Sequence, residues 1–416
     1  HIKGGNASYE VTDGTITGTS TMDTPNTFLC SDEVYDDFIL ELDYKVDPKL
    51  NSGIQIRSNS ISKYRNGVVH GYQIEIDPSE RAWSAGIYDE QRRGWLYNLK
   101  NNPDAQKAFR QGQWNHYRIE AIGDTLKTWI NGVAAAHLID DRTARGFIGL
   151  QVHSIHEEDK NGTQVSWKNI RIMTKDLDKY SQKSPLEPLM TNNALTHGEM
   201  DEGWKLLWDG VTTKGWRGAK LEGFPEGGWV IQDGALSVLA SGGGEAEAGG
   251  DIVTTEMYGD FELKVDFRIS EGANSGIKYY VDTELNQGAG SSIGLEYQIL
   301  DDEKHPDAKL GNHKGSRTLA SLYDLVQADT TKIVNPIGSW NHARIKSEDN
   351  HVEHWLNGLK VLEYERKSEA YRKLVSESKY VTWPNFGEAD QGHILLQDHG
   401  DFVSFKNIKI RNLKGK

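Results

Sequence analysis

The chain contains one series of motifs twice, and this repetition limits the folds that it can adopt. WNHYRIEA at Trp114–Ala121 returns as WNHARIKS at Trp340–Ser347, and in each copy the Asn of an NG pair, Asn131 or Asn357, follows 17 residues after the Trp. The other matched pairs, in chain order, are VTDGTITG and IQDGALSV, YDDFILELDYKV and YGDFELKVDFRI, NSGIQIR and NSGIKYY, AGIYDE and ASLYDL, TWING and HWLNG, GLQVH and LLQDH, and WKNIRI and FKNIKI. We therefore expect two domains of one fold, and 416 residues are enough for two cores.

A polar segment separates the two copies. We place the first domain at residues 1–176, a linker at 177–198 and the second domain at 199–416. The linker contains two prolines among mostly polar residues, which is typical of a connecting segment. The second copy opens with GWKLLWDGVTTKGWRGA, which has no counterpart in the first, so we expect the opening of the first domain to lie upstream of His1.

The strand patterns predict an all-β fold. DFILELDYKV and DFELKVDFRI alternate apolar and polar residues, as half-buried strands do, and NG after TWI or HWL predicts a hairpin. Long helical patterns are nearly absent; SEAYRKLVSESKY, in an insertion of the second copy, is a candidate short helix. We predict an antiparallel β-sandwich or jelly roll in each half. Cys30, the single cysteine, has no partner for a disulfide and is expected to be a buried apolar residue.

Charge and composition exclude some partners. The net charge of −14 argues against nucleic acid and anionic membrane surfaces, which require a basic face. No apolar run approaches the roughly 20 residues of a membrane span. Twelve Trp and 17 Tyr against ten Phe suit a carbohydrate partner, because Trp and Tyr stack on sugars and offer a polar tip, although they also fill β cores.

The ordered set GWKLLWDGVTTKGW, IQDG, DFEL, NSGI, EYQILD, WN, HWLNG, LQDHG and FKNIKI resembles the 3-keto-disaccharide hydrolase domain family. The resemblance covers nearly the whole chain as two tandem domains. It implies the jelly roll of concanavalin A-like lectins and glucanases, with the site on a concave sheet. It also implies a bacterial periplasmic or secreted enzyme that acts on glycosides whose C3 hydroxyl has been oxidised to a ketone.

That substrate class implies an elimination. A ketone at C3 acidifies the C2 proton, so that a base can remove it and the C1 oxygen can leave; hydration then completes a net hydrolysis. Such a site needs a base near C2 and an electrophile at the C3 oxygen. It does not need the two flanking carboxylates of an ordinary glycosidase.

In the second copy, Glu296 and Gln298 share one face of the expected strand IGLEYQI, because strand residues two apart point the same way. Gln397 and His399 of LLQDH share a face for the same reason. Glu296, Gln298 and His399 are the catalytic candidates, with Glu296 or His399 as the base and the other as an acid or metal ligand. The other expected substrate-binding residues of this copy are Gln397, Tyr280, His305, Tyr323 and His354.

In the first copy, Gln73, Glu75 and Asp77 alternate on one face of an expected strand. They resemble the Glu-x-Asp-x-x-Glu strand of laminarinase-like glucanases, but they lack its two Glu with four residues between them. Further substrate-binding candidates of this copy are Arg57, His153, Trp83 and Tyr88. All of these residues could instead be polar or aromatic side chains of an exposed sheet face and its loops.

Three functions remain open. The first is the keto-glycoside hydrolase, the second a non-catalytic protein with two lectin-like modules, and the third an ordinary endoglucanase. A divalent metal ion could polarise the ketone, although no close ligand spacing supports it. The loop DDEKHPDAKLGNHKG at Asp301–Gly315 could bind calcium or be a plain exposed loop.

Overall fold

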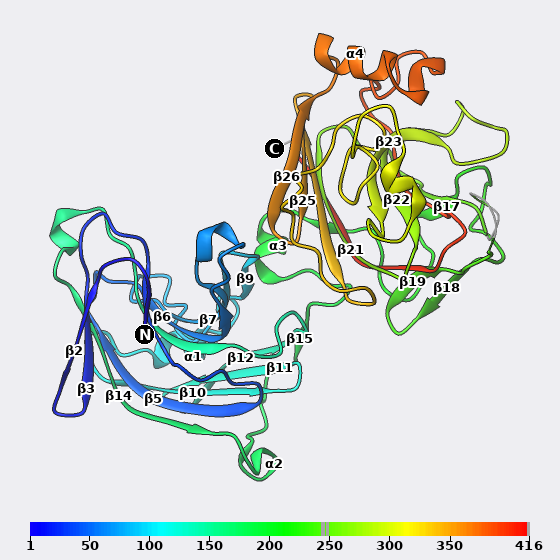
Figure 1. Ribbon diagram of the computed structural model, residues 1–416. Coiled ribbons are helices and arrows are strands. Elements are labelled where there is room, and N and C mark those ends of the chain that lie inside the picture. Colours follow the sequence, from blue (N-terminus) through cyan, green and yellow to red (C-terminus); the bar gives the residue numbers. More distant parts are fainter. Residues whose placement is uncertain (243–245, 247–248, 414–416) are drawn as a thin grey trace. The chain divides into compact units, whose positions relative to one another are not determined.

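The computed structural model of the protein describes residues 1–242, 246 and 249–413 (Figure 1). The chain forms two compact units. The first comprises His1–Thr191 and Leu195–Glu202, and the second Asn192–Ala194 and Gly203–Lys416. Cys30 is buried, as expected from the sequence.

Two sheets form the first unit. One has seven strands, in the order β1 (Ile2–Gly4), β4 (Thr27–Cys30), β13 (Phe147–Val152), β6 (Ser52–Asn59), β7 (His70–Ile76), β8 (Ile87–Glu90) and β9 (Gly94–Tyr97). The other has eight, in the order β15 (Leu189–Met190), β12 (Val133–Ile139), β11 (Thr125–Ile130), β10 (Asn115–Ile122), β5 (Phe38–Val46), β14 (Gln164–Met173), β3 (Thr15–Thr19) and β2 (Ser8–Thr12).

Two sheets also form the second unit. The smaller has five strands, in the order β17 (Trp216–Gly218), β20 (Ile252–Thr254), β27 (His393–Leu396), β22 (Asn274–Asp282) and β23 (Ile293–Leu300). The larger runs β18 (Trp229–Gln232), β19 (Ala235–Val238), β28 (Val403–Asn412), β21 (Phe261–Ile269), β24 (Asn341–Glu348), β25 (His351–Leu356) and β26 (Leu359–Glu365), and β16 (Lys205–Leu206) pairs with β28.

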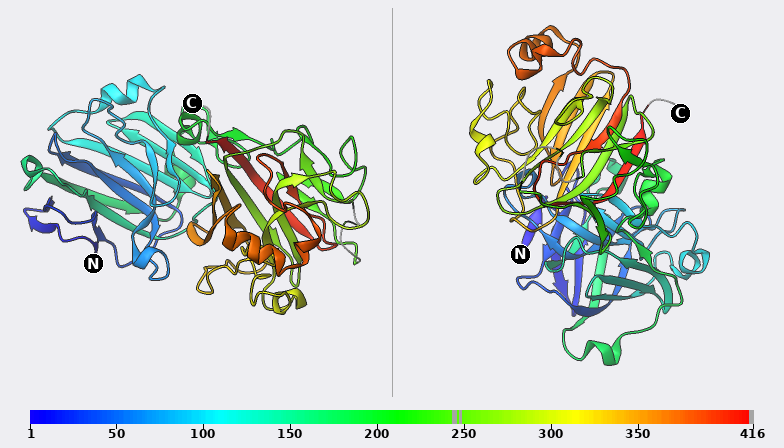
Figure 2. Two further views of the ribbon diagram at one scale, coloured as in Figure 1. Left: turned by 90° about the horizontal axis from the view of Figure 1, so that it is seen from above. Right: turned by 90° about the vertical axis from the view of Figure 1, so that its right-hand side faces the viewer.

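Helices are short and few in the described chain. They are α1 (Pro103–Ala108), α2 (Leu177–Tyr180), α3 (His197–Asp201) and α4 (Glu369–Ser376), with the 3-10 turns η1 (Arg65–Gly67), η2 (Glu158–Lys160), η3 (Pro306–Lys309) and η4 (Lys379–Thr382). Helix α4 lies in the insertion of the second copy and confirms the short helix expected there; it sits outside the sheets of its unit (Figure 2). Among the described residues, none of these helices has the length and apolar composition needed to cross a membrane.

The two units have the same strand order. In the larger sheets, β3-β14-β5-β10-β11-β12 of the first unit corresponds to β19-β28-β21-β24-β25-β26 of the second. In the smaller sheets, β4-β13-β6-β7 corresponds to β20-β27-β22-β23. Every strand pair within these four-strand and six-strand runs is antiparallel. The prediction of a jelly-roll β-sandwich in each half is confirmed.

Alternation along the strands builds one core in each unit. On β5, Leu40, Leu42 and Tyr44 point inward, and on β6 Ile54 and Ile56 do so. The second unit repeats this pattern with the inward side chains of β21 and β22. The residues between these inward positions therefore lie on the opposite face of each sheet, where they are available for other roles.

The NG pairs close hairpins, as predicted. Asn131 and Gly132 join β11 to β12 with φ of 49° and 84°, and Asn357 and Gly358 join β25 to β26 with φ of 50° and 85°. Two successive residues with positive φ match the twist of the flanking strands, and Asn and Gly adopt this conformation at low cost.

The matching WN and NG motifs meet at the same place in each unit. In the second unit, the Asn357 side chain donates to Oδ1 of Asn341 at 2.8 Å and accepts from the backbone N–H of His342 at 2.9 Å. Asn115 and Asn131 make the equivalent contacts in the first unit, also at 2.8 Å. We call each pair the asparagine clamp, since it fixes a hairpin turn to the start of the neighbouring strand.

A second repeated contact lies on the outer face of each larger sheet. The imidazole of His116 and the amide of Asn169 both contact Asp43, at 2.8 and 2.6 Å. In the second unit, Asn407 contacts the matching aspartate, Asp266, at 2.7 Å. These residues account for the H of WNH, the D of the long strand and the N of the KN motif. Their repetition therefore has a structural reason.

We expect Asn341→Ala to destabilise the second unit by about 1–3 kcal/mol. Asn341 is buried, and its Oδ1 accepts from both the Asn335 backbone and the Asn357 amide, so the change leaves two donors without an acceptor. Denaturant unfolding followed by circular dichroism measures the loss. The exposed Asn412→Ala is the control and should lie within about 0.5 kcal/mol of the wild type. Equal stability of both variants would contradict a role for the clamp.

Candidate functional site

The smaller sheet of the second unit turns a polar face away from the core. Ile277 and Tyr279 of β22 belong to the core, so Lys278 between them points to the other side. Lys278 pairs in register with Glu296 on β23, which places the two side chains next to each other. We call this surface the polar face of the second unit.

Glu296 and Lys278 form a buried ion pair. Nζ of Lys278 lies 3.7 Å from Oε2 of Glu296, and both side chains are less than a tenth exposed. A Cβ on Gly276 would lie 2.5 Å from Oε1 of Glu296, so the carboxylate rests over this glycine. The missing side chain thus provides the space that the carboxylate occupies.

Neighbouring polar groups hold the ammonium of Lys278 in place. It donates to the hydroxyl of Ser291 and, at 3.3 Å, to the carbonyl of Ser292. The Ser291 hydroxyl donates in turn to Asp251, whose carboxylate also accepts the backbone N–H groups of Ser292 and Asp398 at 3.2 and 2.9 Å. Asp251 therefore turns the hydroxyl hydrogen of Ser291 away from Lys278, so that the hydroxyl accepts from the lysine.

Two glutamines flank Gly276. The backbone N–H of Gln397 donates to the Gly276 carbonyl at 3.0 Å, and Gln298 pairs with Gly276 from β23. Oε1 of Gln298 accepts from its neighbour Ile299 at 3.0 Å, whereas its buried Nε2 has no hydrogen-bond partner among the described residues. A buried amide N–H without a partner is costly, and a bound ligand could satisfy it.

His399 lies three residues beyond the end of β27. Its Nε2 is 3.2 Å from Nδ2 of Asn274, and its ring is 6.1 Å from that of His305, nearly perpendicular to it. Burial lowers the pKa of His305, and the neighbouring His399 lowers it further. Nδ1 of His305 accepts the backbone N–H of Asp307 at the start of η3, which fixes the ring.

Tyr323 closes the other side of Glu296. Its backbone N–H donates to the Glu296 carbonyl at 3.0 Å, and its hydroxyl donates to Asp307 at 2.8 Å. Burial and the nearby Glu296 and Asp307 carboxylates raise the pKa of this hydroxyl well above its ordinary value. Two cations lie over its ring, the guanidinium of Arg317 at 5.1 Å and the ammonium of Lys379 at 4.3 Å.

The structure thus brings together six of the residues singled out in this copy: Glu296, Gln298, Gln397, His399, His305 and Tyr323. Tyr280, which we expected to bind substrate, does not lie on this face. Its hydroxyl donates to the Gly259 carbonyl and contacts Ser347, and its ring belongs to the core. A register shift between Tyr279 and Asp282 turns Tyr280 inward, with φ of 52°.

His354, also expected to bind substrate, does not lie on this face either. It lies on β25 of the larger sheet and faces the core, where Nε2 contacts the Tyr279 hydroxyl at 2.7 Å and Nδ1 the Ala320 carbonyl at 3.0 Å. Burial lowers the pKa of His354 to about 4, so it stays neutral near pH 7.

In the first unit, Arg57 was expected to bind substrate, but its guanidinium contacts the protein itself. Its side chain is buried and donates to the carbonyls of Asp36 and Gly123, both at 2.8 Å, and to the carboxylate of Asp37 at 2.9 Å. A register shift after Ile56 turns the side chain of Arg57 over, as the shift on β22 does for Tyr280. Arg57 has φ of 46°. It is a structural residue.

The first unit has a corresponding polar face on β13, β6, β7 and β8. Gln55 and Gln73 pair in register there, at the positions of Lys278 and Glu296. Gln55 donates to Oε1 of Gln73 at 2.6 Å, and Gln73 donates to Oε2 of Glu75 at 2.9 Å. The face that holds an ion pair in the second unit therefore holds a chain of amides in the first.

Glu75 ends this chain at the position of Gln298. Its other oxygen, Oε1, accepts from the amide of Asn51 at 2.8 Å. Both donors are neutral, and burial raises the pKa of the Glu75 carboxyl from its ordinary 4.5 to about 7.

The other candidates of the first unit surround this face. Tyr88 pairs with Gln73, and Trp83 lies 4.9 Å from Trp95, the ring next to Tyr88. His153 is partly buried, with Nδ1 2.7 Å from the Ser154 carbonyl. Asp77 directly follows β7 and is buried, and its Oδ2 accepts from Nε of Arg81 at 2.8 Å. The structure thus places Tyr88 and Trp83 in one aromatic cluster beside Gln73.

One possible metal-binding group appears among the described residues. His351, Glu353 and Glu363 can bring one ligand atom each within 4.8 Å of one another. They lie on β25 and β26 of the larger sheet, away from the predicted ligands, and Lys360 already contacts both glutamates. In the loop expected to bind calcium, Asp301 accepts three backbone N–H groups and Asp307 contacts Arg317 and Tyr323.

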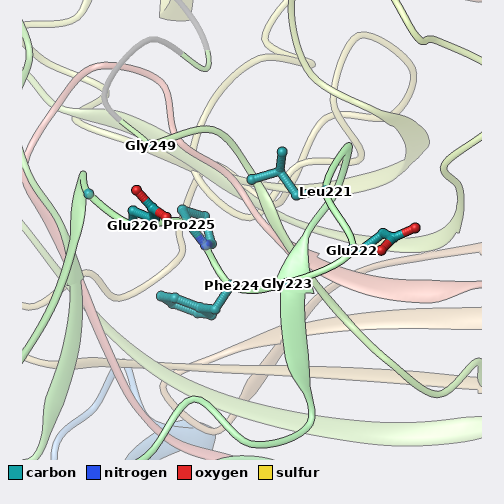
Figure 3. A pocket seen from close by; sticks show the side chains of 8 residues that line it. Leu221, Glu222, Gly223, Phe224, Pro225, Glu226 and Gly249 are labelled. Carbon is teal, nitrogen blue, oxygen red and sulfur yellow. The ribbon is translucent and has the colours of Figure 1, made fainter.

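Two cavities lie near β17 of the second unit. One, of about 560 Å³, is lined by Leu221–Gly227 and Gly249 (Figure 3). Its only titratable lining groups among these are the exposed Glu222 and Glu226, so we assign it no chemistry. The other, of about 360 Å³, is lined by glycines and alanines together with Lys220, Leu221 and Asp251. Asp251 connects this cavity to Lys278 through Ser291.

Lys278 was not predicted from the sequence, nor were Asp251, Ser291 and Asn274. A signal for Lys278 was present: the matched motifs NSGIQ and NSGIK differ at this position by a charge. The strand periodicity also places it on the face opposite Ile277. Asp251 and Ser291 act from loops, and no periodicity locates such residues.

We expect the first unit to lose stability as the pH rises from about 5 to 8. Because the folded-state pKa of Glu75 is raised from 4.5 to about 7, its contribution is complete below pH 4.5 and disappears as the pH passes 7. The difference amounts to about 3 kcal/mol. Urea unfolding at both pH values should show this slope in the wild type and in the exposed control Glu10→Gln, but not in Glu75→Gln. An unchanged slope in Glu75→Gln would contradict the shift.

Comparison with known proteins agrees with the resemblance drawn from the motifs. A 3-keto-disaccharide hydrolase of Bacteroides thetaiotaomicron is 36% identical over 232 residues, which cover 51% of this chain and 79% of that protein. Two solved structures from Parabacteroides distasonis, provisionally described as glycosyl hydrolases, are also similar. One is 32% identical (TM-score 0.46, 54% of this chain and 100% of the other) and one 30% identical (TM-score 0.38, 50% and 99%). The family model of the 3-keto-alpha-glucoside-1,2-lyase-like domain matches residues 1–173 and 203–411, and the chain therefore belongs to this family.

Proposed function

We propose that the second unit cleaves 3-keto-glycosides by elimination followed by hydration. One observation carries the proposal: the buried ammonium of Lys278 lies 3.7 Å from the carboxylate of Glu296. A base beside a fixed positive charge is what enolate formation requires, since the base removes the C2 proton and the cation stabilises the charge that develops on the C3 oxygen. The partner of Glu296 is an ammonium, whereas a retaining glycosidase pairs two carboxylates.

Glu296 takes the proton from C2, and the electrons of the C–H bond form a C2=C3 double bond with negative charge on the C3 oxygen. This enolate collapses, the C1–oxygen bond breaks and a C1=C2 double bond forms next to the restored ketone. Water then adds to C1 and gives one proton to His399, which donated a proton to the leaving oxygen, and C2 regains its proton from Glu296. The products are a 3-keto sugar and the released alcohol.

The other residues of the face bind the substrate or transfer a proton. Ser291 and Ser292 take two hydrogen bonds from Lys278, and its third N–H is the one assigned to the ketone oxygen. His399 is the acid that protonates the leaving oxygen, and Gln298 offers its Nε2 to a sugar hydroxyl. The cavity beside Asp251 is the place for the second sugar. The Lys278 ammonium supplies the charge that a divalent metal would otherwise provide, so we expect activity to survive a chelator.

The proposed setting is the periplasm or the exterior of a bacterial cell, where oligosaccharides are degraded. The chain is similar to a hydrolase named for a disaccharide substrate, and this substrate class is the basis of the proposed setting. Cell fractionation with an antibody against the protein tests it, and recovery with cytoplasmic markers would overturn it.

We expect the protein to cleave a 3-keto-disaccharide and to leave the unoxidised parent intact. Glu296→Gln and Lys278→Met should each reduce kcat by at least about 100-fold, because one lacks the base and the other the enolate charge. Exchange of the C2 proton with deuterated water, measured by NMR, should fall in parallel. Glu353→Gln on the larger sheet is the control and should match the wild type.

His399 is tested by changing the leaving group. His399→Ala should slow cleavage of the disaccharide strongly but that of a 3-keto nitrophenyl glycoside only slightly, because nitrophenolate leaves without a proton. Equal losses on both substrates would remove His399 from this role. Full activity of Glu296→Gln would overturn the proposal for the second unit.

Gly276→Ala provides a test that leaves every charged group present. The new methyl group would meet the Glu296 carboxylate at 2.5 Å, so the carboxylate must move away from its position over the glycine. We expect kcat to fall about tenfold or more, while the melting temperature changes little. Gly223→Ala, whose Cβ meets no described atom within 4 Å, should retain wild-type rates. Wild-type activity of Gly276→Ala would show that the position of the carboxylate is unimportant.

A further inference from the structure

We propose that the polar face of the first unit is a non-catalytic binding site for an uncharged, unoxidised pyranose. The site consists of Gln55, Gln73 and Glu75, the amide of Gln151, and the adjacent rings Tyr88 and Trp95. The contacts that form this site all lie in the first unit, and the choice of a sugar as its ligand rests in part on the function proposed for the second.

The face corresponds to that of the second unit position by position but lacks its cation. Gln55 stands where Lys278 stands, and Gln73 where Glu296 stands. The carboxylate of the first unit, Glu75, accepts hydrogen bonds from two neutral amides. A base without a positive charge to stabilise the enolate is a poor catalyst for elimination. Carboxylate and amide groups are nevertheless well suited to bind sugar hydroxyls, which both donate and accept.

Gln151 supplies the observation that points to a ligand. It lies on the same face, because Leu150 pairs with Ile54 and both of these belong to the core. The side chain is fully buried, and neither Oε1 nor Nε2 has a hydrogen-bond partner among the described residues. Each such atom costs about 1–3 kcal/mol. One hydroxyl that donates to Oε1 and one that accepts from Nε2 would satisfy the amide.

Aromatic rings border the same row. Tyr88 pairs with Gln73, and Trp95 pairs with Tyr88, so the three side chains lie side by side across β7, β8 and β9. The two rings are 5.3 Å apart, and both are only partly buried. Arg81 lies over Trp95 at 5.1 Å and closes this cluster on one side. Aromatic rings next to hydrogen-bonding side chains suit a pyranose, which has apolar C–H faces and polar edges.

The row therefore contains a polar part that includes Gln73 and Gln151 and an aromatic part that includes Tyr88. Gly53 lies between Gln151 and Glu75, and a Cβ there would lie 2.5 Å from the Gln73 side chain. As in the second unit, the glycine gives a polar side chain room to fold over the sheet. Two faces of the same design are thus expected to bind the same class of ligand, and only one of them has the charges for chemistry.

Calorimetric titration of the full chain with maltose, cellobiose and sucrose tests the inference. Gln151→Leu keeps the size of the side chain and removes the two unsatisfied atoms, so we expect the fold to be at least as stable as the wild type. Its affinity for the bound sugar should nevertheless fall at least tenfold. Gln164→Leu, an exposed position on β14, is the matched control and should bind as the wild type does.

A purely structural role for Gln151 predicts no change in sugar affinity. Equal binding by Gln151→Leu and the wild type, or no binding of any of the three sugars at 10 mM, roughly the limit of weak sugar binding, would overturn the inference. Keto-sugar cleavage that persists in Glu296→Gln and disappears in Glu75→Gln would also overturn it, because the first unit would then be catalytic. Binding is measured without turnover, so its outcome is separate from that of the reaction proposed for the second unit.

Discussion

Polar side chains are buried on one face of the smaller sheet in each unit, and this constraint organises both sites. A buried charge or amide is costly unless it has a partner. In the second unit, Glu296 and Lys278 meet this demand together, and Asp251 and the serine pair beside it complete the arrangement. In the first unit a chain of amides serves the same purpose. Loop residues supply further partners for these groups, and a glycine in each face leaves room for a polar side chain to lie over the sheet.

A small number of substitutions separates the two faces. The first unit has Gln55 where the second has Lys278, and the order of Glu and Gln on the next strand is reversed. These differences replace an ion pair with a network of amides. The carboxyl of Glu75 then lies in surroundings that raise its pKa to about 7, with only amides as hydrogen-bond donors. The framework of strands is the same in both units, so the chemistry proposed for the second unit and the binding proposed for the first depend on side chains rather than on the fold.

The fold could be predicted because strand alternation and turn residues are local signals. The same alternation placed Glu296 and Gln298 correctly on one face. It failed for Tyr280 and Arg57, since each follows a register shift that turns the side chain over, and a single sequence gives no sign of such an irregularity. His354 was misplaced for another reason: it occupies a core position, where its ring nitrogens contact a buried tyrosine and a carbonyl. Asp251 and Ser291 reach the site from loops, which have no period.

The asparagine clamp has a consequence for how such chains are found in genomes. The motifs that make the repeat conspicuous, WN and NG, fix a hairpin turn on the larger sheet of each unit, whereas Glu296 and Lys278 lie on the smaller sheet of the second. A search built on those motifs selects for architecture. A duplicated copy that lost its enzymatic residues would keep these motifs, so a count of domains based on them would overestimate the number of enzymes. The lysine of NSGIK is the more informative letter for that purpose.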